Sequence, residues 1–358
     1  MNIRKDDLSI FSYKKPLFFL FVLLFTSCNS IEYFYSVSKM ELSVLFNAKK
    51  IDKIIKSSDY PVELKEKLLF VKDVKKYAVD NLGLKINKQY LYYSSVKLKQ
   101  PMFVLTAVYS TNWKFKKWWF PIVGYVPYLG FPLKERAEEE AKKFSKMGYD
   151  VDIRPAIAFS TLGYLPDPIL PQMLKRADPF IASLIFHELT HGTVYFKSNT
   201  MFNEHIAVLV ENIGGMQFAE KRWGIDSDEY AKVKNRFLDL VVYSDFISKL
   251  YRELNVLYNS KVTDSVKLKK RKLLLKEKQA EFKKIKFNSQ IFSKYSLLPP
   301  NNAKLWQFMI YYLKFKDMVD IYYKNENCSV NLFLKFFKEK PKKISPWEWL
   351  KKWEKYPG

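Results

Sequence analysis

The chain has 358 residues, which is enough for one large domain or two smaller ones with a substantial buried core. Hydrophobic residues make up 48% and aromatic residues 17%, a composition that excludes intrinsic disorder. With 61 Lys and Arg against 37 Asp and Glu, the net charge is +24. This charge permits contact with nucleic acid, anionic lipid or acidic polymers without choosing among them. The two cysteines, Cys28 and Cys328, are too few for a disulfide scaffold or a four-thiolate zinc site.

The N-terminus has the pattern of an export signal. Lys14 and Lys15 precede an apolar stretch whose core, residues 17–25, is too short to span a bilayer of roughly 30 Å as a helix. Small residues then lead into Cys28. This order resembles a bacterial lipoprotein signal, in which the chain is cut before the cysteine and lipid is attached to it. An ordinary signal peptide and an uncleaved anchor are the alternatives.

From this resemblance we expect residues 1–27 to be a signal peptide, Cys28 to be lipidated, and residues 29–358 to form a single domain. The membrane would then be a partner through the N-terminal lipid. The location would be the bacterial cell envelope, on the periplasmic or the outer-membrane face. Most of the positive charge lies after the signal, so a basic domain could also lie against anionic headgroups.

The first half of the remaining chain alternates between helical and strand patterns. Apolar residues recur at three- and four-residue spacing before residue 80, and Tyr and Val are enriched after residue 88. The expected elements are helices over 31–80, strands over 88–110, an aromatic loop or hairpin over 113–132, a helix over 133–150 that ends near Gly148, and a strand and Pro-rich loop up to 170.

The second half is predicted to be helical. Residues 178–196 indicate a buried helix with Asp178 as N-cap and Pro179 in the first turn. The further expected elements are a helix over 203–222, a long helical hairpin around 227–287, and two helices over 302–340. The fold class is therefore α+β and predominantly α-helical, with a small β-sheet.

The sequence HELTH at residues 187–191 is the motif that carries chemistry. On a helix, His187 and His191 lie one turn apart on one face, so both imidazoles can bind one zinc ion. Glu188 lies beside them and can accept a proton from water activated by the metal. Two structural histidines are the alternative, but burying two imidazoles and a carboxylate in an apolar helix without a metal is costly.

A catalytic zinc site usually has three protein ligands and one open position. Glu204 and Glu211 lie on the next expected helix, seven residues apart, so they project to nearly the same side but about 10 Å apart along the axis. Only one of them is expected to bind the ion, while the other orients a ligand through hydrogen bonds. His205 is turned about 100° away from Glu204 and is not expected to be a ligand.

HELTH followed by FNEHIAVLVE resembles the gluzincin zinc peptidases, which include the thermolysin and aminopeptidase N types. In these, a second helix carries an Asn-Glu motif whose Glu is the third ligand. The resemblance implies a gluzincin-like core in which His187, His191 and Glu204 hold one Zn²⁺ per chain and Glu211 supports a ligand. Twelve residues separate His191 from Glu204, a shorter connection than in aminopeptidase N types.

A second resemblance covers most of the chain. Bacterial proteins called "putative aminopeptidases", often lipoproteins, share several blocks of sequence with it. The shared blocks are WWFPIVGYVPYLGF, MGYDV, STLGYLPDPIL, IFHELTH, FNE and PPNNAKL. This resemblance implies a membrane-anchored zinc peptidase, an aminopeptidase by family name, with a peptide or protein as substrate.

The implied mechanism needs a donor for the oxyanion that forms during peptide hydrolysis. The tyrosines considered for this role are Tyr243, Tyr251, Tyr311 and Tyr312, and Tyr164 and Asp167 are candidates to line the cleft. The alternative function is a non-catalytic zinc-containing envelope lipoprotein that acts as a scaffold or binding module. Hydrolysis of another amide, such as a cell-wall crosslink, is a third. The Lys-rich stretch 261–286 is expected to be a solvated face, and no nucleic-acid partner is expected.

Overall fold

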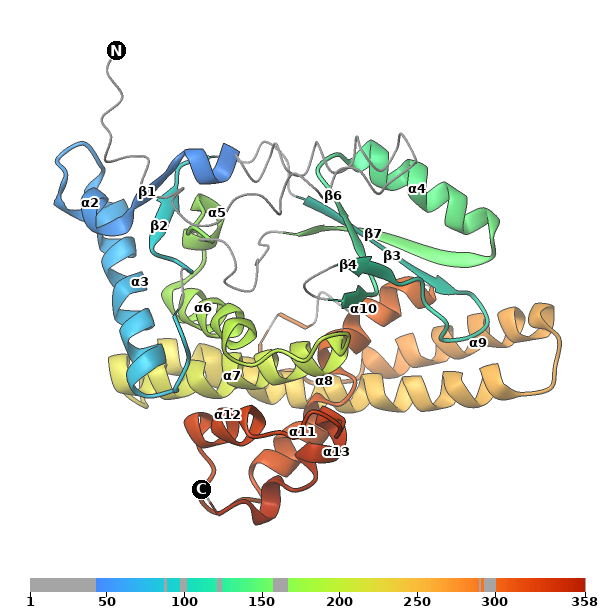
Figure 1. Cartoon of the computed structure of the whole chain (residues 1–358). Coiled ribbons are helices and arrows are strands. Elements are labelled where there is room, and N and C mark those ends of the chain that lie inside the picture. Colours follow the sequence, from blue (N-terminus) through green and yellow to red (C-terminus); the bar gives the residue numbers. More distant parts are fainter. Residues whose placement is uncertain are drawn as a thin grey trace. The chain divides into compact units, whose positions relative to one another are not determined.

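The computed structural model describes residues 43–86, 89–96, 102–120, 124–156, 167–289, 291–292 and 301–357. The expected signal peptide, Cys28 and Tyr164 lie outside these residues. The elements from Val44 onward belong to one compact unit (Figure 1). In the described part of the chain, no helix combines the length and the apolar character needed to cross a membrane.

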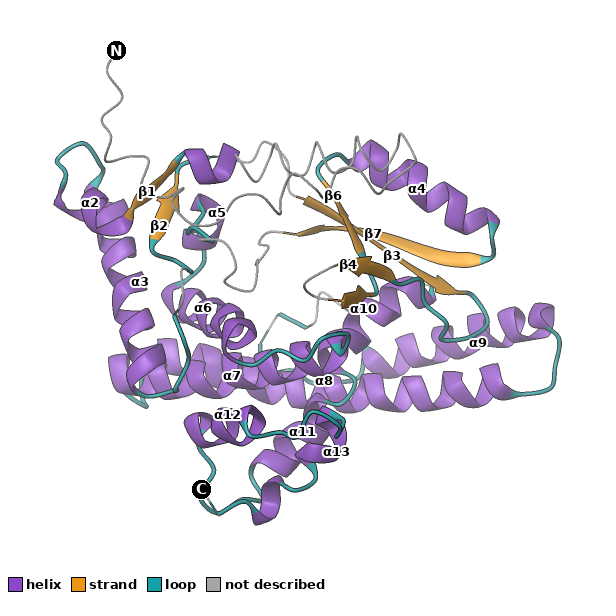
Figure 2. Ribbon diagram, viewed as in Figure 1, coloured by secondary structure: helices purple, strands orange, loops and turns teal. Residues whose placement is uncertain are grey.

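Helices make up most of the described chain and the strands are short (Figure 2), as the α+β, mainly helical prediction requires. The helices are α2 (Ile51–Lys56), α3 (Val62–Asp80), α4 (Lys134–Lys146), α5 (Pro171–Leu174), α6 (Asp178–Thr193), α7 (Thr200–Trp223), α8 (Asp228–Asn259), α9 (Asp264–Phe282), α10 (Asn302–Tyr312), α11 (Phe315–Tyr322), α12 (Val330–Lys338) and α13 (Pro346–Leu350). The strands are β1 (Ala48–Lys50), β2 (Tyr92–Ser94), β3 (Met102–Tyr109), β4 (Trp118–Phe120), β5 (Gly124–Val126), β6 (Leu129–Phe131) and β7 (Tyr149–Ala156).

The central helical layer consists of α6 and α7, which pack against each other, with α8 alongside both and α3 against α6. Helix α6 is apolar on several sides, and Ile181, Ile185, Phe186 and Leu189 are all buried. A helix that is apolar nearly all round needs neighbours on all sides to remove that surface from water. The HELTH motif thus lies on a helix that is enclosed by its neighbours.

Two adjacent glycines allow α6 and α7 to approach closely. A Cβ atom on Gly215 would lie 2.5 Å from the Ser183 hydroxyl of α6, and one on Gly214 would lie 2.7 Å from Leu82. Glycine in a helix interior costs stability because it loses more backbone freedom than alanine. Two in succession are explained here by the space that their missing side chains leave for α6 and for Leu82.

A small antiparallel sheet of order β6-β3-β7 forms the second layer. Leu105, Thr106, Ala107 and Val108 are all buried, so both faces of β3 are covered. Helices α4 and α10 pack on the sheet, and Figure 1 shows them on opposite sides of it. The expected aromatic hairpin is present nearby as β4 paired antiparallel to β5.

Strand β7 carries polar residues on the face toward α10. Asp150, Asp152 and Arg154 alternate along the strand and so share one face. The backbone N–H of Asn302 donates to Asp150, Gln307 Nε2 donates to Asp152, and Arg154 Nη2 donates to the Tyr311 hydroxyl. This β7–α10 polar ladder fixes Arg154 and Tyr311 relative to each other.

Three details differ from the sequence-based expectation. Residues 48–50 form a short strand that pairs with β2 instead of continuing a helix, because tertiary pairing outweighs local periodicity. The segment 302–340 holds three helices rather than two. The N-cap of α6 is Ala177, and the Asp178 carboxylate forms an ion pair with Lys67 of α3.

The close approach of α6 and α7 can be tested by substitution. We expect Gly215→Ala to lower the free energy of unfolding by roughly 1–3 kcal/mol, because the new Cβ collides with the Ser183 hydroxyl. Ser183→Ala removes that hydroxyl, so the double variant should recover most of the loss. Urea unfolding of both single variants and the double variant measures this coupling. A Gly215→Ala protein as stable as the wild type would contradict it, since alanine then gains helix propensity without a clash.

Candidate metal centre

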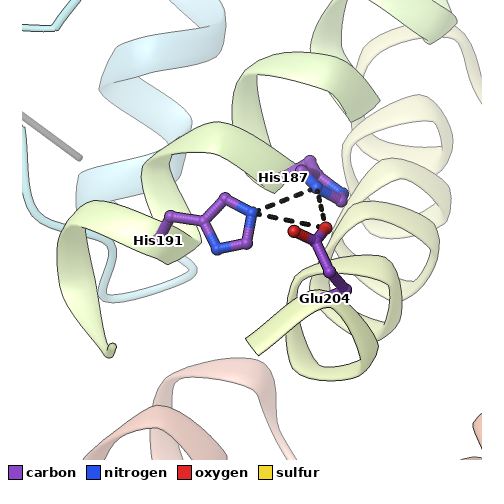
Figure 3. A group of neighbouring side chains, drawn as sticks. All are labelled: His187, His191 and Glu204. Carbon is purple, nitrogen blue, oxygen red and sulfur yellow. Dashed lines mark hydrogen bonds and ion pairs between the residues drawn. The ribbon is translucent and has the colours of Figure 1, made fainter. Parts of the chain in front are cut away.

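Three side chains from α6 and α7 point toward one another (Figure 3). His187 Nε2 lies 3.2 Å from His191 Nε2, and Glu204 Oε2 lies 3.4 Å from His187 Nε2 and 3.7 Å from His191 Nε2. The two histidines lie one turn apart on α6, while Glu204 enters from the first part of α7. Residues 17 positions apart in the sequence thus meet because the helices pack face to face.

These distances fit a metal ion held by all three atoms. Tetrahedral bonds of about 2.0–2.1 Å separate neighbouring ligand atoms by about 3.4 Å. The observed separations of 3.2, 3.4 and 3.7 Å lie around that value. Two imidazole nitrogens and a carboxylate oxygen that point at one another can each offer a lone pair to a cation placed between them. The cluster can therefore hold a metal ion.

Glu211 lies behind the cluster and contacts His187 rather than completing the ligand set. Its Oε2 is 2.9 Å from His187 Nδ1, and its Oε1 accepts a hydrogen bond from Arg236 Nη2 of α8 at 2.5 Å. A proton on Nδ1 that is donated to Glu211 leaves the Nε2 lone pair directed at the cluster. This Arg236–Glu211–His187 chain links three helices and orients the imidazole.

The buried charges shift the acid–base equilibria of the site. Burial raises the pKa of Glu211, but the Arg236 charge and the His187 hydrogen bond outweigh it and hold the pKa at about 2. Burial also raises the pKa of Glu204, and the two histidines more than reverse this effect. For His187, burial lowers the pKa, while Glu204 and Glu211 raise it well above its usual value. Both glutamates are therefore ionised at neutral pH.

Glu188 follows His187 on α6 and is half-buried. Its backbone carbonyl accepts a hydrogen bond from Gln89 Nε2 at 3.3 Å, and Gln89 itself is fully buried. The Glu188 charge contributes to the raised pKa values of Tyr90 and Tyr311. The carboxylate is therefore near the cluster and within electrostatic reach of two phenols. Next to Gln89, Tyr90 has a positive φ of 57°, an uncommon conformation for a bulky residue.

His205 is buried, but its ring nitrogens bond to backbone groups and not to the cluster. Its Nδ1 donates to the Met201 carbonyl at 2.6 Å, and its Nε2 accepts the Lys314 backbone N–H at 2.9 Å. Burial lowers the pKa of His205 to about 4. With both nitrogens paired to backbone groups, this histidine is neutral and joins α7 to the start of α11.

Of the four tyrosines considered from the sequence, Tyr311 is the one affected by the charges of the site. Burial is the largest cause that raises its pKa to about 12, and the charges of Glu204 and Glu188 add to it. Tyr243 is fully buried in an aromatic cluster with Phe282 and Phe308. Tyr251 packs on Trp113 instead, and the Tyr312 carbonyl accepts the Ser244 hydroxyl. Asp167 is buried, and its backbone carbonyl accepts the Tyr90 N–H.

Sequence reasoning missed Arg154, Tyr128 and Arg236. Burial raises the pKa of the Tyr128 phenol, and the charge of Glu204 raises it further. The alternation of Asp150, Asp152 and Arg154 along a strand was an available signal that one polar face meets a partner. Nothing in the sequence linked Arg236 to Glu211, because the link depends on how α8 packs on α7.

Comparison with known proteins places the chain in a family. A family model described as "Putative aminopeptidase" matches residues 32–344. The chain belongs to this family. The match includes the metal cluster, Glu188, Glu211 and the β7–α10 polar ladder, and the family name suggests a hydrolase that acts on peptides. No curated protein and no solved structure matches the chain.

The role of Glu211 in this aminopeptidase-family protein can be tested with an added metal. We expect Glu211→Gln to raise the Kd for Zn²⁺ by about 10- to 100-fold, because His187 loses the anion that orients it. Competition with a chromophoric chelator measures the Kd. Glu220→Gln, on the exposed end of α7, is the matched control and should leave the Kd unchanged. Equal affinities for all three proteins would contradict the orienting role.

Proposed function

We propose that the protein is a zinc peptidase of the bacterial envelope, with His187, His191 and Glu204 as the zinc ligands and Glu188 as the general base. The observation that supports this most strongly is the convergence of three donor atoms, within 4.8 Å of one another, beside a half-buried carboxylate. Two histidines and one glutamate are the protein ligands typical of catalytic zinc in peptidases, where the fourth position stays open for water or substrate. The order of the ligands along the chain is that of the gluzincins.

The residues around the site have separate tasks in peptide hydrolysis. Bound zinc would supply a Lewis acid that polarises the substrate carbonyl and acidifies water. Glu188 takes a proton from the attacking water on its carboxylate and later delivers it to the leaving amine. Glu211 and Arg236 keep His187 in the tautomer that the ligand role requires.

Tyr311 is the proposed donor to the oxygen that becomes negative during attack. Arg154 Nη2 donates to the Tyr311 oxygen at 3.4 Å, so the phenolic hydrogen can point elsewhere. Burial and the nearby glutamates raise the pKa of Tyr311 to about 12, which keeps the phenol protonated at neutral pH. A protonated donor held on a helix next to the cluster suits the stabilisation of an oxyanion.

The envelope location rests on the N-terminal sequence. A lipid on Cys28 would hold the domain at a membrane surface, and the net charge of +24 would add attraction to anionic headgroups. Peptides or proteins of the envelope or the exterior are then the accessible substrates.

The general-base role can be tested by Glu188→Gln in the zinc-loaded full chain. We expect kcat for peptide hydrolysis to fall by about 10²- to 10⁴-fold, while zinc content and thermal stability stay near those of the wild type. Kinetics on a peptide library, with metal analysis of the same samples, measures both properties. Glu220→Gln, which removes an exposed carboxylate at the end of α7, is the control and should keep the wild-type kcat.

Two results would contradict the proposal. Glu188→Gln could retain wild-type kcat, which would remove Glu188 from the mechanism. The wild type could bind one zinc and cleave no peptide in the library, which would favour the alternative of a non-catalytic zinc-containing envelope scaffold.

A further inference from the structure

Arg154 is a cation beside the candidate metal centre that lacks a carboxylate partner in the described part of the chain. Its one polar contact there is the hydrogen bond from Nη2 to the Tyr311 hydroxyl, at a long 3.4 Å. Its Nε is buried and has no hydrogen-bond partner. The guanidinium carbon lies 5.5 Å from the centre of the Tyr311 ring. Arg154 is half-buried, and an Nε–H that is shielded from water without a hydrogen-bond acceptor is costly, so this arrangement calls for a reason.

The other charges of the same ladder have partners. Asp150 forms an ion pair with Arg271 at 2.6 Å and also accepts the Asn302 N–H at 2.8 Å. Asp152, two residues before Arg154, accepts from Gln307 Nε2 at 2.7 Å. The last position of the ladder therefore differs from the first two, since Arg154 meets a neutral phenol where the others meet a charged or amide donor.

Arg154 also lies on the side of the ladder that is near the metal cluster. Its contact Tyr311 is within electrostatic reach of both Glu204 and Glu188. Burial lowers the pKa of Arg154, whereas the Tyr311 phenol and the charge of Glu204 raise it. Strand β7 packs against α10, and α10 packs against α7, the helix that carries Glu204, so the contact between Arg154 and Tyr311 adjoins the helices of the cluster.

We propose that Arg154, supported by Tyr311, is a subsite for a carboxylate of the substrate, namely the free C-terminal carboxylate of the residue that follows the scissile bond. This proposal rests on the proposed peptidase function and names its substrate class. A planar guanidinium with a free Nε matches the geometry of a carboxylate and can hold it with two parallel hydrogen bonds. The substrate thereby supplies a carboxylate bonded to the guanidinium, which the described residues do not.

The subsite limits where a peptide is cut. A carboxylate held next to the cluster places the last peptide bond at the metal, so the residue released on that side is a free amino acid. A dipeptide has a single peptide bond, so cutting the last bond also releases the N-terminal residue, as an aminopeptidase does. Short peptides with an unblocked C-terminus are therefore the expected substrates.

The test compares each of several dipeptides with its C-terminal amide, which differs only by the loss of the negative charge. We expect the zinc-loaded full chain to favour the free acid by roughly 10- to 100-fold in kcat/KM, the range typical of a charged hydrogen bond. Arg154→Met should abolish the preference, and Arg154→Lys should keep part of it. Arg252→Met, which removes an exposed arginine of α8, is the matched control and should keep the full preference.

A binding measurement separates this proposal from the peptidase proposal. Glu188→Gln is titrated with a dipeptide and with its amide by calorimetry, alone and combined with Arg154→Met. Tighter binding of the acid, lost with Arg154→Met, supports the subsite even if the wild type cleaves nothing. Equal binding and equal cleavage of acid and amide, or an Arg154→Met defect that is the same for both, would overturn it and leave the peptidase proposal standing.

Discussion

The packing of α6 against α7 is the constraint on which the site depends. His187 and His191 reach Glu204 only because the two helices lie face to face, with Gly215 against Ser183. The separations among the three donor atoms are all below 4 Å, which lets one metal ion contact all three. The stability of this helix pair and the metal affinity of the cluster are thus two consequences of the same contact.

The charges around the cluster fall into two groups. The acidic group would be neutralised by a bound metal ion, and the basic group by an anion of the substrate. On one side, Glu211 is paired with Arg236, whereas the charge contacts of Glu204 in the described part of the chain are the two histidines, so Glu204 offers negative charge that a metal ion would neutralise. On the other side, Arg154 has a phenol as its contact and leaves positive charge for a substrate anion. A buried charge is tolerated when its partner arrives with the ligand, and both proposals follow from that principle.

The three residues of the cluster could be named from the sequence in two steps. One helical turn fixes His187 relative to His191, and the resemblance of FNEHIAVLVE to the gluzincin motif indicated Glu204 rather than Glu211. The mainly helical α+β class also followed from periodicity. The contacts that depend on packing were not predictable. Arg236 reaches Glu211 from α8, and Arg154 reaches the site through the pairing of β7 with α10, so neither has a local signal. Residues 48–50 formed a strand because β2 lies beside them.

Metal content of the full chain, purified without added metal, tests the central claim most directly. The account predicts about one zinc per chain in the wild type and in Glu188→Gln, and a large loss of zinc in Glu204→Ala with the fold retained by circular dichroism. A well-folded wild-type protein that holds no zinc, even after zinc is offered, would contradict the metal centre and with it the peptidase mechanism.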